Sequence, residues 1–291
     1  MKLLRDRVYF VEAPDKARFP YCHCLFIDDD ARVIIDTSCG RQQALEISAS
    51  GVDVILNSHF HEDHILNNLL FDKAQVWVHH LDAPPMVDMR MFFKYYGFID
   101  PEGVELGQKF IDSLDLQPTP VHRKLRDGEI LDFGHVRLKV IHTPGHTPGH
   151  CAFFQEETGF LFTGDIELSK FGPWYAHGCS NIDDFINSIQ RCKDLQATMV
   201  VTSHKGIFTE NIQQRFQDYM NIIFMKEEKI YNALREPQTL KQLAVKHLYY
   251  GSDVKMDIYM VYFEKWGVKL HLERMLEQKR IGREGELYFQ R

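Results

Sequence analysis

Cysteine is scarce in this 291-residue chain, and its six cysteines show neither C-x-x-C spacing nor a dense framework. We therefore expect reduced thiols rather than a disulfide scaffold. No apolar run reaches the ~18 residues that a membrane span requires. Charged residues also interrupt the N-terminal stretch, where a secretory signal would need apolar ones. These absences predict a cytoplasmic protein that does not span a membrane.

An excess of basic residues is also missing. Lysine and arginine total 34 against 41 acidic residues, which gives a formal net charge of −7. A protein that coats nucleic acid usually has the opposite balance, so nucleic acid is not the favoured partner. The chain has no internal repeats, and 44% of its residues are hydrophobic. This composition is typical of a globular protein, and the length suggests two domains or one large domain with an appendage.

The first two thirds of the chain alternate short β-rich runs with helical stretches. Continuous apolar runs such as 52–56 and 198–202 predict strands covered on both faces, and residues 181–194 predict a helix. Strands with interleaved helices and hairpins favour a mixed α/β sandwich over an all-parallel sheet. The expected hairpins pair 21–27 with 32–36, 129–132 with 137–142, and 151–155 with 159–163.

Two regions depart from this alternation. Methionine and aromatic residues crowd residues 84–116, which we expect to form a helical insertion. Core packing is the ordinary use of such residues, and the alternative is a lid in which Phe92 and Phe93 line a substrate cleft. From about residue 225 the pattern becomes helical and ends in a hairpin over 281–290, which is the outline of a winged helix. We therefore expect one domain over residues 1–224 and a helical, winged-helix-like domain over residues 225–291.

The most informative segment is SHFHEDH at residues 58–64, directly after a predicted buried strand. His59 and His61 are two positions apart in extended chain, so their side chains point the same way and can share one metal ion. Asp63 and His64 lie where a helix begins, and their side chains diverge toward a different point. Since imidazole and carboxylate groups are common metal ligands, one short loop can serve two adjacent cations.

Three further residues of ligand type follow predicted strands later in the chain. His146 lies within TPGHTPG, Asp165 ends FTGD, and His204 lies within TSHKG. Functional loops collect at one edge of a sheet, so these side chains can join the first segment in a single site.

In this order the motifs resemble those of the metallo-β-lactamase superfamily, which carries H-x-H-x-D-H, a downstream histidine, an aspartate and a final histidine. The motifs extend from Asp36 to His204, and a compatible strand pattern extends from about residue 3 to 224. The resemblance implies an αβ/βα four-layer sandwich with a dinuclear metal site at its edge, and a catalytic domain over residues 1–224. It also implies that His59, His61 and His146 hold one metal, that Asp63, His64 and His204 hold the other, that Asp165 bridges them, and that Asp36 orients the site without touching either metal.

The ligand set implies two divalent metal ions, with zinc favoured and iron or manganese as alternatives, because these ligand types suit all three. A water shared by two such cations would be a hydroxide near neutral pH, and the metals would polarise the substrate oxygen. Asp165 and Asp63 are therefore the candidate catalytic residues, and Asp63 could also shuttle a proton. Trp174 and Tyr175 follow shortly after Asp165, where related enzymes line the substrate pocket.

Differences between this chain and particular branches of the family it resembles narrow the range of possible reactions. Asp165 stands where secreted β-lactamases of the commonest dizinc class carry cysteine, and His61 where the oxidoreductase branch typically has glutamate. Only 38 residues separate Asp165 from His204, too few for the inserted domain of the large nucleic-acid-processing members. We therefore expect a hydrolase that cleaves an ester, thioester or lactone of a small molecule.

Two alternatives stay open. One is a phosphodiesterase or endoribonuclease of the same fold, which would need Lys170 or Lys205 near the phosphate. The other is a metal-bearing sensor or effector without catalytic activity. The sequence also leaves open whether the chain assembles into a homo-oligomer.

Overall fold

The computed structural model describes residues 1–252 and 254–291. Its first sheet has seven strands, ordered as they occur along the chain. Strands β1 to β4 pair antiparallel, whereas β4 to β7 pair in parallel. The strands are β1 (Lys2–Arg5), β2 (Val8–Val11), β3 (Cys24–Ile27), β4 (Val33–Ile35), β5 (Val54–Leu56), β6 (Gln75–His79) and β7 (Arg123–Leu125).

The second sheet has six strands in the order β13-β12-β11-β10-β9-β8. Strands β11 and β12 pair in parallel, and the other neighbours are antiparallel. The hairpins expected at β3–β4, β8–β9 and β10–β11 are all present. The strands are β8 (Ile130–Asp132), β9 (Arg137–His142), β10 (Cys151–Gln155), β11 (Phe160–Phe162), β12 (Met199–Thr202) and β13 (Gly206–Phe208).

Two apolar cores explain the continuous apolar runs of the central strands. Every residue of β3, β4 and β5 is buried. Val33 and Ile35 of β4 pack into a core shared with the second sheet, whereas Ile34 packs with Ala44 and Ile47 of helix α1. Successive side chains of a strand point to opposite faces, so a strand that is covered on both faces is apolar at every position.

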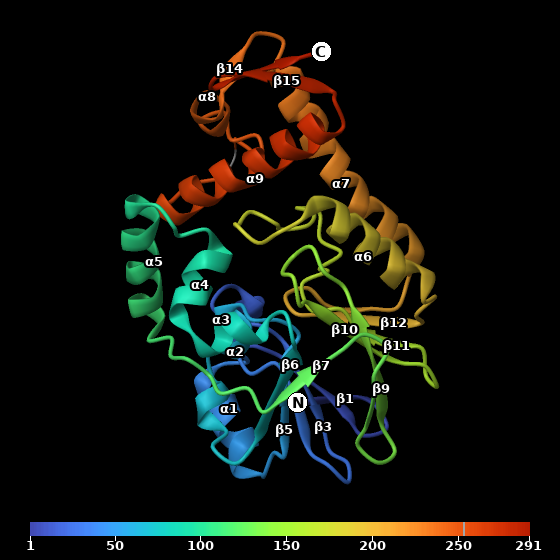
Figure 1. Cartoon of the computed structure of the whole chain (residues 1–291). Coiled ribbons are helices and arrows are strands. Elements are labelled where there is room, and N and C mark those ends of the chain that lie inside the picture. The colour runs from blue at the N-terminus through green and yellow to red at the C-terminus, as the bar shows by residue number, and fades with distance from the viewer. Residues whose placement is uncertain (253) are drawn as a thin grey trace.

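Helices cover the outer face of each sheet (Figure 1). Helix α1 (Arg41–Ala49) lies against the first sheet, and α6 (Ile182–Asp194) and α7 (Ile212–Ala233) pack together over the second. Phe185 of α6 and Phe216 of α7 are fully buried in the same core as Leu161 of β11. The layers are therefore helix, sheet, sheet and helix, which is the α/β four-layer sandwich that the motifs imply.

The helices expected between residues 84 and 116 are present as α3 (Ala83–Val87), α4 (Met89–Tyr96) and α5 (Pro101–Leu114). Asp88 and Asp100 cap the last two helices by accepting hydrogen bonds from backbone N–H groups. Helix α4 ends at Gly97, which has a φ of 82°. A Cβ at this position would collide with the Trp266 ring, so glycine permits the close approach of the C-terminal helices.

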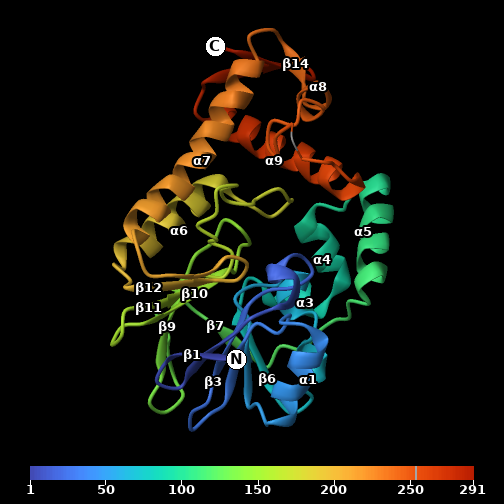
Figure 2. The same ribbon diagram turned by 180° about the vertical axis from the view of Figure 1, so that it is seen from behind.

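The C-terminal region begins within a long helix. Helix α7 is continuous over 22 residues, so the domain boundary expected at residues 224–225 falls inside it. Helix α9 then runs from α5 back to α7 (Figures 1 and 2). No helix in the described part of the chain combines the length and apolar character needed to cross a bilayer. The remaining elements are α8 (Leu240–Ala244), α9 (Ile258–Glu277), and a sheet of β14 (Gln238–Thr239), β16 (Leu287–Gln290) and β15 (Ile281–Glu284).

Candidate metal centre

The seven side chains predicted as metal ligands meet at one edge of the two sheets. His59 and His61 follow β5, while Asp63 and His64 lie in the short helix α2 (Glu62–Ile65). The other three come from the loops after β9, β11 and β12, and they are His146, Asp165 and His204. Each loop starts where a buried strand ends, so the paired strands hold residues that are distant in sequence at fixed positions.

The side chains form two groups that share Asp165. In the first, nitrogens of His59, His61 and His146 and an oxygen of Asp165 all lie within 4.8 Å of one another. In the second, ligand atoms of Asp63, His64 and His204 lie equally close together. Asp165 Oδ1 is 3.0 Å from His64 Nε2 and 3.5 Å from His204 Nε2, and its Oδ2 is 3.3 Å from His146 Nε2. The carboxylate therefore lies between the two groups.

His64 Nε2 and Asp165 Oδ1 are buried and lie 3.0 Å apart, but neither makes a hydrogen bond of suitable geometry to the described residues. Burying an unpaired polar atom is costly unless a bound group satisfies it. Two divalent cations fit this donor set, because imidazole nitrogens and carboxylate oxygens are the groups that zinc, iron and manganese accept.

Hydrogen bonds behind the cluster orient three of the imidazoles. Nδ1 of His146 donates to the carbonyl oxygen of Trp174, and Nδ1 of His204 donates to that of Ala17, each over 2.8 Å. His64 Nδ1 lies 2.8 Å from Asp36 Oδ2. In the neutral ring such bonds place the proton on Nδ1, so that Nε2, which faces the cluster, is the atom that would bind a cation.

Asp36 lies behind His64, at the ring nitrogen opposite the one that faces Asp165. Its carboxylate faces His64 and accepts hydrogen bonds from the backbone N–H and the hydroxyl of Ser58, at 2.8 and 2.7 Å. Asp36 has a φ of 57°, a strained conformation for a residue other than glycine. The surrounding structure holds this strain at the site, where the carboxylate is needed to fix the loop at 58–64.

Burial and neighbouring charges set the protonation of the cluster. Burial alone would lower the pKa of His64 and His204, but the neighbouring Asp165 outweighs it and raises both well above the usual value, so a cation would displace a proton from each ring. Burial, together with the neighbouring imidazoles, holds the pKa of His59 and His61 well below the usual value. Both rings are therefore neutral near pH 7 and keep an electron pair for a metal. Burial alone would raise the pKa of Asp165, but the neighbouring His64 and His204 outweigh it and hold the pKa well below its usual range. Asp165 is therefore ionised.

Sequence reasoning missed His177, a fully buried residue in the loop before α6. Its Nε2 lies 2.9 Å from Nε2 of His61. The hydroxyl of Ser180 donates to the carbonyl of His146, so it accepts the hydrogen on Nδ1 of His177. His177 Nε2 is then an acceptor, and His61 must donate to it. This series of hydrogen bonds leaves Nδ1 of His61 free to bind a cation.

Replacing His177 by alanine should therefore weaken metal binding by about 10–100-fold, as the loss of such an outer partner does at other metal sites. The physical reason is that His61 would lose the acceptor that sets its tautomer and ring orientation. The affinity can be measured by competition with a chromophoric zinc chelator. The matched control is His80→Ala, since His80 is exposed and remote from the cluster in sequence and contacts. Equal affinity in both variants would contradict this role.

Asp82 is a second residue of the site that no local sequence pattern would have identified. Its carboxylate is fully buried and accepts hydrogen bonds from Phe60 N, Thr147 Oγ1 and Gly149 N. These donors belong to the two loops that carry His59, His61 and His146, so Asp82 ties the loops together. Burial raises the pKa of Asp82 to about 7, although the three hydrogen bonds oppose this shift.

A cavity of about 530 Å³ opens beside the cluster and is lined by His61, Asp63, His146, Asp165 and His204. Of the four aromatic residues expected against substrate, Trp174 lines it. The other three are not among its lining residues. Phe92 is fully buried against Phe60 and Tyr96, Phe93 packs on Phe98, and the hydroxyl of Tyr175 meets His271 Nε2 at 2.9 Å. They belong to the second layer of packing behind the wall, which corrects the expectation for these positions.

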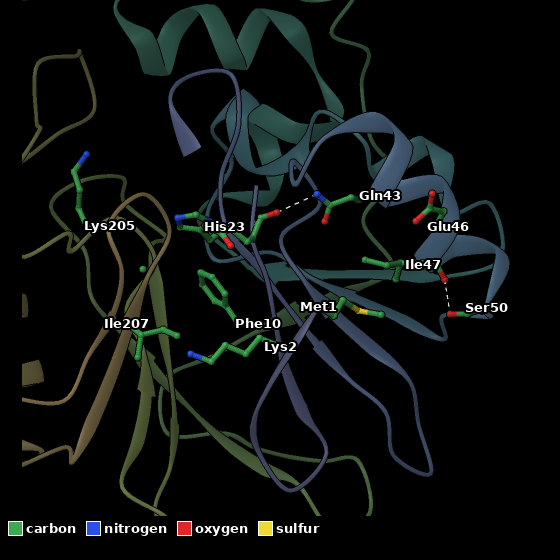
Figure 3. Close-up of a pocket in the computed structure, with 12 residues that line it drawn as sticks. Met1, Lys2, Phe10, His23, Gln43, Glu46, Ile47, Ser50, Lys205 and Ile207 are labelled. Carbon is green, nitrogen blue, oxygen red and sulfur yellow. Dashed lines mark hydrogen bonds between the residues drawn. The ribbon is translucent and has the colours of Figure 1, made fainter. Parts of the chain in front are cut away.

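A larger cavity of about 720 Å³ lies elsewhere, between the N-terminal strands, α1 and β13 (Figure 3). Phe10, His23, Glu46 and Ile207 are among the residues that line it. None of the seven predicted ligands does, so the smaller cavity is the one that belongs to the candidate metal centre. Lys205 lines both cavities, whereas Lys170 lines neither.

Comparisons with known proteins agree with this architecture. The family model of the metallo-beta-lactamase superfamily matches residues 17–204. Among solved structures, a metallo-beta-lactamase family protein from Thermus thermophilus is 25% identical, with a TM-score of 0.75 over 98% of this chain and 99% of that one. A beta-lactamase domain protein from Burkholderia ambifaria is 17% identical, with a TM-score of 0.76 over 100% and 93% of the two chains.

Among curated proteins, an atrochrysone carboxyl ACP thioesterase from Aspergillus fumigatus is 23% identical over 72% of this chain. The match covers 58% of the thioesterase, so this chain spans little more than half the length of that relative. These comparisons support a hydrolase. Because the family model matches more than half of its residues, including all seven predicted ligands, the chain belongs to the metallo-β-lactamase superfamily.

Proposed function

We propose that the chain is a metal-dependent hydrolase that cleaves the thioester, ester or lactone bond of a small molecule, with a thioester as the favoured substrate. The observation that carries this proposal is the convergence of seven ligand-type side chains beside a cavity, six of them around the carboxylate of the seventh, Asp165. The thioesterase name of a relative that matches most of this chain supports the choice of bond.

The cluster would hold two divalent metal ions, with zinc favoured and iron or manganese as alternatives. His59, His61 and His146 would hold one, Asp63, His64 and His204 the other, and Asp165 would contact both. When bound, the cations would supply a hydroxide at neutral pH and polarise the substrate carbonyl.

The chain's own residues orient the reaction and move the proton. Hydrolysis adds the oxygen of water to the carbonyl carbon, breaks the C–S bond and transfers one proton to the departing sulfur. Asp63 Oδ2 lies 3.5 Å from His204 Nε2 at the edge of the cavity, where it can carry that proton. The aromatic wall around Trp174 offers an apolar surface for the acyl group.

Hydrolysis of a phosphodiester, the main alternative, is less well supported by the cavity. Arg18 and Lys205 are the cationic residues other than histidine among its lining residues, and both are exposed. Glu62, Glu167 and Asp257 line it as well, in addition to the predicted ligands. Burial raises the pKa of Glu62 to about 8 and that of Glu167 to about 7, so these two carboxyls are not simple negative charges near pH 7. A phosphate would still need Arg or Lys beside the metals, and no buried one lines the cavity among the described residues.

We also propose that the C-terminal helices and three-stranded sheet form a winged-helix-like unit that packs on the catalytic body, and that the protein is cytoplasmic.

Removal of metal should abolish the activity. We expect purified protein to hydrolyse acyl thioesters, and we expect a strong chelator to lower the rate by more than about 100-fold, because the hydroxide and the polarised carbonyl both depend on the cations. Adding back zinc, iron or manganese should restore the rate, which also identifies the metal. The panel should include p-nitrophenyl esters, lactones and bis-p-nitrophenyl phosphate. Turnover of the phosphodiester alone would select the nuclease alternative. No turnover of any substrate by metal-loaded protein would select the non-catalytic one.

A further inference from the structure

The cavity beside the candidate metal centre is unusually rich in aromatic side chains. Histidine aside, nine aromatic residues line it, and they come from five separate parts of the chain. Single apolar surface residues need no explanation, but rings that gather around one cavity next to a reactive centre indicate a binding pocket. These residues are Phe19, Tyr96, Phe110, Phe171, Trp174, Tyr219, Tyr250, Tyr259 and Phe263.

The rings are arranged from a buried inner end to an open rim. At the inner end, Trp174 packs edge-on against His61 and His146 at 5.8 and 5.7 Å between ring centres. Phe263 is 7% exposed and meets Trp174 edge-on at 5.4 Å. At the rim, Phe19 is 51% exposed and Phe171 is 37% exposed. A ligand that enters past the exposed rings therefore reaches the predicted metal ligands alongside Trp174 and Phe263, which contact one another.

The lining rings form two groups, each held together by its own contacts. In the first, Phe171 stacks on Tyr250, whose hydroxyl accepts a hydrogen bond from Trp174 Nε1 at 2.8 Å. In the second, Phe110 of α5 packs against Tyr259 of α9 at 5.3 Å. Hydrogen bonding and packing hold these rings in place, so the walls are formed before a ligand binds.

Resting on the function proposed above, we propose that the substrate carries a neutral aromatic acyl group, and that α9 selects this group through Phe263. Aromatic rings favour other rings in offset or edge-to-face contact beyond what buried area alone provides, so an aryl group gains more here than an alkyl chain of equal size. An acidic acyl group is disfavoured, because Arg18 and Lys205 are exposed and no buried arginine or lysine lines the cavity in the described part of the chain, so a charged group would be buried without a partner. The cavity volume is in the range of small-molecule sites.

The first test compares two N-acetylcysteamine thioesters, 2-naphthoyl and decanoyl, with metal-loaded protein. We expect kcat/KM to favour the aryl substrate. We also expect Phe263→Leu, which removes the ring but keeps most of the apolar volume, to lower the aryl-to-alkyl ratio by about 3–10-fold. The matched control is Val261→Ala, because Val261 lies on the same helix and is 55% exposed. Thermal unfolding of both variants shows whether either has lost its fold, and Tyr259→Leu serves as a second ring variant.

The second test measures binding without turnover. Isothermal titration calorimetry with N-methyl-2-naphthamide and N-methyldecanamide should show tighter binding of the aryl amide, and Phe263→Leu should remove the difference. Thioester hydrolysis with equal rates and equal affinities for the two classes would overturn the aromatic pocket and leave the proposed function intact. Preferential aryl binding without hydrolysis of any thioester would overturn the proposed function and support the pocket.

Discussion

Replacing Asp165 by alanine is expected to abolish hydrolysis and to lower the amount of bound metal. The carboxylate lies within 3.5 Å of a nitrogen of His64, His146 and His204, and no other predicted ligand joins both groups. Loss of a residue that hydrogen-bonds a metal ligand typically lowers metal affinity or activity by about 10–100-fold. Asp165 would itself contact both cations, so its loss should have a larger effect. We therefore expect kcat/KM to fall by more than about 100-fold. His59→Ala should have a similar effect, since it removes one imidazole from the first group.

The measurement pairs thioester hydrolysis with elemental analysis of the purified protein. Asp72→Ala is the matched control, because Asp72 is an exposed aspartate in a turn before β6 and is not among the predicted ligands. The control should keep the wild-type rate and metal content. An Asp165 variant that retained two metal ions per chain and the wild-type rate would rule out the assignment of the centre.

The local part of the site was predictable because ligand spacing depends on the geometry of one short segment. His59 and His61 lie in the same ligand group, although residues 58–60 form a bend rather than a strand, and Asp63 and His64 lie in the first turn of α2. His177 and Asp82 act across long sequence separations. His177 meets His61 from 116 positions away, and no repeat or spacing relates the two. Only the tertiary structure reveals such partners.

The fold was predictable where a strand buried on both faces appears in the sequence as a continuous apolar run. Strands β4 and β5 are wholly apolar and buried, and both were expected. Strand β7 (Arg123–Leu125) was not, because only Leu125 is buried and the pairing with β6 defines the strand. The boundary expected at residue 224 followed a change of composition, yet residues 212–233 contain no glycine or proline to end the helix.

Replacing Glu227 by alanine should produce the largest loss of stability. This carboxylate of α7 is 2% exposed and accepts hydrogen bonds from Arg274 of α9 and from Arg280 just before β15, at 2.5 and 2.6 Å. Nδ1 of His271 also faces it at 3.4 Å. Removing one member of a buried ion pair typically costs ~3–5 kcal/mol. The two arginines would keep their exposed partners Asp183 and Glu228 but would lose the buried carboxylate that they share. We expect the free energy of unfolding to fall by about that amount in a denaturant titration.

The neighbouring Glu228→Ala is the matched control, because Glu228 also pairs with Arg280 but its side chain is 56% exposed. An exposed pair of this kind contributes about 0–1 kcal/mol. Equal losses in the two variants would show that the buried network does not stabilise the attachment of α9 to α7.

The stability of the wild type should also depend on pH through Glu227. Burial alone would raise the pKa of this carboxyl, but hydrogen bonds from His271 and Arg274 outweigh burial and hold the pKa below its usual value of 4.5. A group with a depressed pKa in the folded state stabilises the fold above its unfolded pKa, and this contribution is lost as the pH falls through the folded value. The stability difference between wild type and Glu227→Ala should therefore be constant from about pH 7 to 5 and shrink below about pH 4.5. Because protonation removes the charge that holds the two arginines, a difference that stayed constant down to about pH 3 would mean that Glu227 acts through packing rather than through its charge.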